Sequence, residues 1–227
     1  YALPAHTLPQ WQAQLERALR YAGEHLSLYQ LTFEPGTRFY QALQTGRMHA
    51  LDEDTAADLY SWTVDRMAAA GLPQYEISNY ARPGQESRHN MVYWQGGDWI
   101  GVGPGAHGRL GQTEHRRALA NLRSPEKWRD DVEAGQPGVE QDEAVPQNEV
   151  GEELAMTGLR LASGINRKRF ATVAGYPLEA TIAQAKQQSL VAEGLAWSDA
   201  GGFGLTPGGR MLLDSAIGFL LTSDDHY

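Results

Sequence analysis

The sequence of 227 residues contains no cysteine. The chain alone therefore forms no disulfide and supplies no thiolate to zinc or to an iron–sulfur cluster. It has no apolar run near the roughly 20 residues that cross a bilayer, and its first residues show no signal-peptide pattern. These absences favour a cytoplasmic protein without an integral membrane segment.

Basic residues are also few. The 19 Lys and Arg residues stand against 28 Asp and Glu, which gives a formal net charge of −9. Because an acidic surface repels the phosphate backbone, we expect no nucleic-acid partner. The contents of 41% apolar and 21% charged residues are typical of a globular chain with one or two domains.

The first 80 residues alternate between helical and extended patterns. Apolar residues repeat at helical spacing in 8–22 and in 54–70. Thr7 and Gln10 form a capping-box pattern before the first of these helices. Extended apolar segments are predicted at 1–4, 25–31 and 74–78. The alternation predicts an α/β fold with a parallel sheet, part of a barrel, and we interpret the start in an extended segment as a cut within a domain.

The middle of the chain is predicted to be less regular. Residues 79–98 lack a clear pattern, 99–103 are predicted to form a last apolar strand, and 124–133 a helix. The acidic stretch 136–147 has prolines near both ends and is predicted to be a linker. This divides the chain into a first domain, 1–135, and a second, 148–227.

The second domain is predicted to be mainly helical and winged-helix-like. Helices are expected at 149–162, 167–174, 178–188 and 207–221, with a hairpin of two short strands between 196 and 206. Residues 148–227 hold 6 basic and 9 acidic residues, a net charge of 6 − 9 = −3. This charge is poorly suited to DNA, so a protein partner is the alternative for such a module.

The densest chemistry lies in residues 75–110. Six glycines fall between 96 and 108, but Ala106 and His107 follow them where a phosphate-binding loop needs Lys and Ser or Thr. His89 stands near the aromatic residues 93 and 94, and is either a hydrogen-bonded structural histidine or a ligand to a planar group. No set of metal ligands is predicted in this chain. Five other histidines are predicted to face solvent: His6, His25, His49, His115 and His226.

Several segments resemble one family, the radical-SAM coproporphyrinogen oxidases and the related HemW haem chaperones. HNMVYW at 89–94 is similar to their HNxxYW motif, and WIGVGPGAHG at 99–108 to their glycine loop. YALPAHT at 1–7, HLSLYQL at 25–31 and QYEISNYARPG at 74–84 resemble segments of their barrel. The C-terminal segment from 194 to 210 resembles their last domain.

This resemblance implies the C-terminal part of a radical-SAM partial (β/α) barrel followed by a winged-helix-like domain. In such proteins a CxxxCxxC motif holds a 4Fe-4S iron–sulfur cluster that works with S-adenosylmethionine (SAM). This chain lacks those cysteines and is not expected to be active alone. The resemblance implies a haem site at His89, Asn90, Tyr93 and Trp94. It implies a place near SAM for Thr32, Gly103, Gly105 and His107.

Three functions remain open at this point. Binding haem and delivering it to an acceptor protein is favoured, because the residues at 89–94 follow the chaperone branch. Oxidation of coproporphyrinogen III with SAM as radical source is the first alternative. A protein-binding winged-helix module is the second.

Overall fold

The computed structural model describes residues 1–222, and the chain divides into two units, residues 1–87 and 88–227. His226 lies outside the described residues. The boundary at Ser87 differs from the expected one near residue 136. Among residues 1–222, no helix combines the length and the apolar character that a membrane crossing needs.

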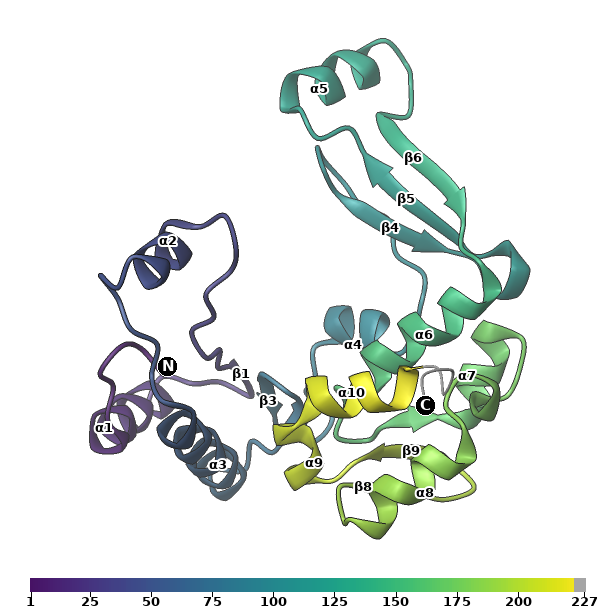
Figure 1. Cartoon of the computed structure of the whole chain (residues 1–227). Helices are drawn as coiled ribbons and strands as arrows, with labels where there is room; N and C mark the ends of the chain where they lie inside the picture. Colours follow the sequence, from purple (N-terminus) through teal and green to yellow (C-terminus); the bar gives the residue numbers. More distant parts are fainter. Residues whose placement is uncertain (223–227) are drawn as a thin grey trace. The chain divides into compact units, whose positions relative to one another are not determined.

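The first unit contains three helices and three short strands in its described part (Figure 1). In chain order these are α1 (Leu8–Leu19), β1 (His25–Ser27), α2 (Arg38–Gln44), α3 (Glu53–Ala69), β2 (Gln74–Glu76) and β3 (Asn79–Ala81). The two long helices begin at caps that the sequence indicates. The Thr7 amide donates to Gln10 Oε1 (3.0 Å), and Asp52 accepts from the Thr55 amide (2.8 Å).

The core of the first unit lies where α1 and α3 face each other and the sheet. Leu15, Leu59 and Met67 are fully buried there beside Tyr80. The indole Nε1 of Trp11 donates to Thr63 Oγ1 (2.7 Å), which joins the two helices through a buried hydrogen bond. The helical spacing of apolar residues therefore predicted the buried faces correctly.

The predicted parallel pairing in residues 1–80 is wrong for the assigned strands. β3 turns back after β2 and lies between β1 and β2, antiparallel to both. A parallel pattern occurs only at the chain start, where Tyr1 N donates to Tyr29 O (2.7 Å) and Leu31 N to Tyr1 O (2.9 Å). The mixture of helices and strands expected for an α/β fold is present.

Two histidines of this unit do not face solvent as predicted. His6 is 6% exposed and lies edge-on to Trp11, and within residues 1–222 neither ring nitrogen has a hydrogen-bond partner. Burial, followed by the charge of the Tyr1 amino group, lowers the pKa of His6. His25 is half-buried, and its Nε2 lies 2.9 Å from Tyr75 Oη.

The second unit carries the remaining elements. They are α4 (Arg88–Trp94), β4 (His107–Leu110), η1 (Thr113–His115), β5 (Arg117–Asn121), α5 (Pro125–Glu133), β6 (Val139–Ala144), α6 (Gln147–Gly158), β7 (Ile165–Asn166), α7 (Arg167–Ala174), η2 (Leu178–Ala180), α8 (Gln184–Ala192), β8 (Ala196–Ser198), β9 (Gly202–Leu205), α9 (Pro207–Met211) and α10 (Leu213–Leu221).

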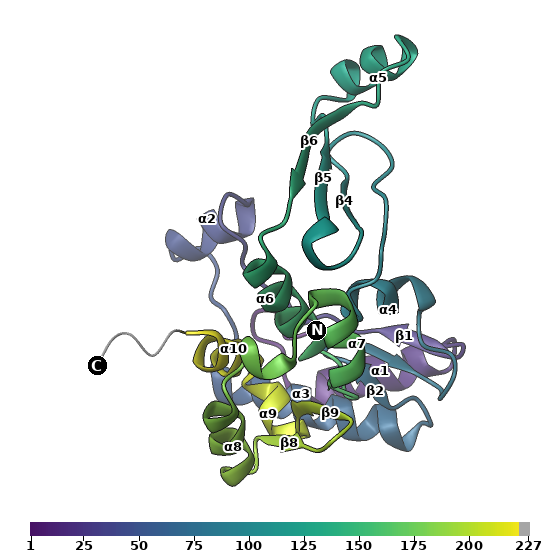
Figure 2. The same ribbon diagram turned by 90° about the vertical axis from the view of Figure 1, so that its right-hand side faces the viewer.

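One part of this unit is the antiparallel sheet β4–β5–β6, with α5 in the connection between β5 and β6. Figure 2 shows the three strands side by side and α5 beyond their end. The stretch predicted as a linker thus contains strand β6, whose register pairs Ala118 with Glu143. The strand predicted at 99–103 is absent, and only Trp99 forms a bridge, to Arg109.

The other part agrees with the predicted winged-helix-like arrangement. Helices α6, α7 and α8 pack with a small antiparallel sheet in the order β7–β9–β8, and β8 and β9 form the expected hairpin. Helix α8 begins at Gln184, later than predicted, because residues 178–180 form a separate short 3-10 helix. The final helix is divided into α9 and α10 at Leu212.

Candidate functional site

The HNMVYW segment forms helix α4, although it was predicted to be irregular. On this helix His89 and Tyr93 are four residues apart and therefore lie on one face. Tyr93 Oη is 3.0 Å from His89 Nε2, and the two rings meet edge to face at 4.9 Å. The ring of Tyr93 in turn meets that of Trp99 at 4.8 Å. The imidazole of His89 is exposed and oriented by this row of aromatic rings.

Asn90 and Trp94, the other two residues of the expected haem site, make different contacts. Asn90 Oδ1 lies 3.5 Å from His89 Nδ1, which is too long for a strong hydrogen bond. The indole of Trp94 is half-buried with the guanidinium of Arg160 4.8 Å from its ring centre. Trp94 thus packs against Arg160, whereas the exposed ring of His89 adjoins the half-buried rings of Tyr93 and Trp99.

The tautomer of His89 determines which nitrogen can bind a metal. If Nε2 carries the proton and donates to Tyr93 Oη, the lone pair of Nδ1 is available. A metal-bound histidine usually has its other nitrogen engaged in such a hydrogen bond. The arrangement is therefore chemically suited to an iron-bound imidazole on an open surface.

The glycine loop between residues 101 and 105 is held by a residue that the sequence did not single out. Asn121, at the end of β5 and 9% exposed, donates from Nδ2 to Gly103 O (2.9 Å) and Gly101 O (3.2 Å). A Cβ at Gly101 would lie 2.5 Å from His107 O, so only glycine fits there. Gly103 and Gly105 have φ values of +99° and +68°, which favour glycine.

A second missed residue is Arg116, which is 1% exposed. Its Nη1 donates to Gly96 O and Gly111 O, both at 3.3 Å. Burial lowers the pKa of this guanidinium. Only tertiary structure reveals it, because its neighbours Gln112, His115 and Arg117 are surface residues.

The expected site residues fall in both units. Thr32 lies on an exposed segment of the first unit, after Leu31. The other seven belong to the second unit. His89, Asn90, Tyr93 and Trp94 lie on α4, and Gly103, Gly105 and His107 lie in or directly after the glycine loop. His107 is exposed at the start of β4. Within residues 1–222, no group of three or more His, Asp or Glu side chains is arranged to hold a metal ion.

Several known proteins are similar to this chain. The family model of the HemN C-terminal domain matches residues 145–212. The heme chaperone HemW of Bacillus subtilis is 33% identical over 222 residues, covering 97% of this chain and 57% of that protein. The mitochondrial radical S-adenosyl methionine domain-containing protein 1 of Mus musculus is 35% identical over 228 residues, covering 96% and 51%.

Residues 145–212 belong to the HemN C-terminal domain family, and the chain as a whole is similar to proteins named heme chaperone HemW. It spans about half the length of the curated relatives it matches. The solved structure of coproporphyrinogen III oxidase (HemN) from Escherichia coli, described as a radical SAM enzyme, superposes with a TM-score of 0.69 at 15% identity. The superposition covers 98% of this chain and 53% of the HemN chain. The predicted fold class is therefore confirmed.

The cofactors of the longer family members fit this chain unequally. The 4Fe-4S cluster does not fit, because the chain has no cysteine. Haem fits the exposed imidazole of His89, which is already oriented by Tyr93. The glycine loop offers close backbone approach, which suits SAM but is not specific for it.

Proposed function

We propose that this chain is part of a protein that binds haem and delivers it to an acceptor protein. The observation that carries the proposal is the exposed imidazole of His89, held through Tyr93 on helix α4. Haem supplies an iron with an open axial position, and an imidazole nitrogen is a common ligand for it. The rings of Tyr93 and Trp99 give the porphyrin an aromatic neighbour.

Exposure of the ligand suits delivery rather than permanent storage. A haem bound on an open helix surface can be reached by a second protein, whereas a buried haem cannot. The names of two similar proteins support a role in haem delivery, because both are called heme chaperone HemW. A cytoplasmic location stays a prediction, since other relatives are named mitochondrial.

Haem titration tests the proposal. We expect the whole chain to bind haem with a Soret band typical of imidazole ligation, and His89→Ala to weaken binding at least tenfold. His115→Ala is the matched control, because His115 is an exposed histidine of the same unit beside Glu114. Equal haem binding by the native chain and His89→Ala would contradict the proposal.

The oxidase alternative is supported by the fold likeness to HemN alone. It needs the iron–sulfur cluster and the SAM site of a longer protein. Anaerobic conversion of coproporphyrinogen III by the reconstituted longer protein would favour it. Haem binding without such conversion would favour the chaperone. The module of residues 148–222 as a protein-binding surface is the remaining alternative.

A further inference from the structure

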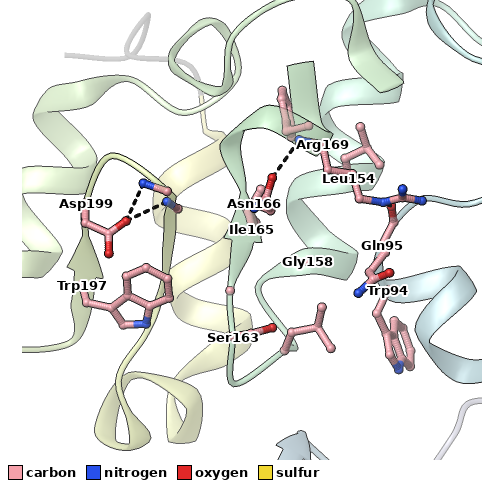
Figure 3. A pocket seen from close by; sticks show the side chains of 15 residues that line it. Trp94, Gln95, Leu154, Gly158, Ser163, Ile165, Asn166, Arg169, Trp197 and Asp199 are labelled. Carbon is pink, nitrogen blue, oxygen red and sulfur yellow. Dashed lines mark hydrogen bonds between the residues drawn. The ribbon is translucent and has the colours of Figure 1, made fainter. Parts of the chain in front are cut away.

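The helical part of the second unit contains a pocket that shares Trp94 with the expected haem site but includes neither His89 nor Tyr93. Its volume is about 420 Å³, within the range of roughly 300–1,000 Å³ usual for small-molecule sites. Three segments border it: the end of α4, the stretch from α6 through β7 to α7, and the β8–β9 hairpin (Figure 3). His89 is not among the residues that line it.

The base of the pocket is apolar and partly aromatic. Leu154, Ile165 and Phe170 are each at most 6% exposed. The indole of Trp197 lies across Gly164 and Gly204, where an added Cβ would come within 2.8 Å of ring atoms. These two glycines therefore make room for a flat ring at the pocket, and a second planar group can stack or pack there.

The rim carries an oriented cation. Arg169 Nε donates to the carbonyl oxygen of Gln95 (2.6 Å), which holds the side chain at the pocket. Within residues 1–222, the two terminal nitrogens of Arg169 have no hydrogen bond and no carboxylate within 4.0 Å. The forked end of a guanidinium binds carboxylates with two parallel hydrogen bonds. The Nδ2 of Asn166, whose Oδ1 accepts from the Arg169 amide, is a further donor.

The neighbouring charged side chains at this rim have hydrogen-bond partners of their own. Arg167 pairs with Glu179 and donates to Gln187 and Ser198. Asp199 Oδ1 accepts from the amides of Gly201 (2.7 Å) and Gly202 (2.8 Å). Asp199 keeps its negative charge at the rim, and Arg169 is the cation whose terminal nitrogens have no partner among residues 1–222. The basic run at 167–169, expected to be only a solvated helix start, supplies one arginine to the pocket.

We propose that this pocket binds a small aromatic carboxylate, with the carboxylate on Arg169 and the ring against Trp197. This inference does not depend on haem binding at His89. The ligand is expected to be an anion because the terminal nitrogens of Arg169 have no partner among residues 1–222, and to carry an aromatic ring because Trp197, Phe170 and apolar side chains line the pocket.

Naphthalene-1-acetate and its neutral methylamide are suitable probes for calorimetric titration of the whole chain. A ligand of this size with ordinary efficiency has a Kd of about 1 mM or lower. We expect the acid to bind at least tenfold more tightly than the amide. Arg169→Gln should reduce this affinity about tenfold or more, since it removes a charge-assisted pair. Lys168→Gln, an exposed neighbour outside the pocket, should leave it unchanged.

A second variant changes affinity in the opposite direction and so excludes simple misfolding. Asp199→Asn keeps the oxygen that accepts from the two glycine amides but removes a negative charge at the rim. Binding of the acid should become tighter. His89→Ala should have no effect. Equal binding of acid and amide, or unchanged affinity in Arg169→Gln, would overturn the proposal.

Discussion

Asn121 provides the sharpest test of how the glycine loop is held. Asn121→Ala removes two hydrogen bonds, to Gly103 O at 2.9 Å and to Gly101 O at 3.2 Å. A neutral hydrogen bond contributes about 0.5–1.5 kcal/mol net, so the loss should be about 1–3 kcal/mol. Both glycines are half-buried and their carbonyls can bind water after the change. The full cost of buried, unpaired carbonyls is therefore not expected.

Thermal unfolding followed by circular dichroism measures this loss. For a chain of this size about 2 kcal/mol corresponds to a lower Tm by roughly 4–8 °C. Hydrogen exchange should also become faster at the amides of residues 101–106. Gln141→Ala is the control, because its side chain is exposed on strand β6 and should change stability by less than about 0.5 kcal/mol. An unchanged Tm together with unchanged loop exchange in Asn121→Ala would refute the reasoning.

Three further predictions follow from the backbone and burial. Ala5 is exposed and has φ of +57°, so Ala5→Gly should stabilise the chain by about 0.5–1 kcal/mol in urea unfolding, as relief of left-handed strain exceeds the entropic cost of glycine. The pKa of His6 is lower in the folded protein than in the unfolded chain, so the unfolded chain binds a proton at higher pH. The free energy of unfolding should therefore fall as pH drops below about 6.5. His6→Leu should make the free energy of unfolding less dependent on pH in this range. Gly101→Ala should destabilise the loop by about 2 kcal/mol or more, measured as Tm, since its Cβ would meet backbone atoms.

Local patterns predicted most elements but not their partners. The helices α1, α3 and α5 carry caps and apolar repeats within their own sequence, and the β8–β9 hairpin has a Gly-rich turn. Strand β6 has no apolar alternation, because all of residues 140–144 are exposed. β6 is a strand because its backbone pairs with β5, and such pairing cannot be predicted from the amino-acid composition of the segment.

Apolar character also misled the prediction at residues 99–103. Ile100 is 72% and Val102 is 87% exposed, so these side chains do not mark a buried strand. His89 shows the converse problem. The sequence shows the aromatic neighbours, but only the helical form of α4 brings Tyr93 within hydrogen-bond distance of His89 while Trp94 contacts Arg160.

The candidate site is shaped by side chains that lie outside it. Residues 95–106 form no helix or assigned strand, so most of their carbonyl groups need partners elsewhere. Arg169 binds the carbonyl of Gln95, Arg116 that of Gly96, and Asn121 those of the glycine loop. Arg169 lies on α7, Arg116 directly precedes β5, and Asn121 is the last residue of β5. Hence the conformation of the loop after α4 depends on donors from α7 and the β5 region. The exposed apolar residues of this loop should tolerate substitution better than these three polar residues do.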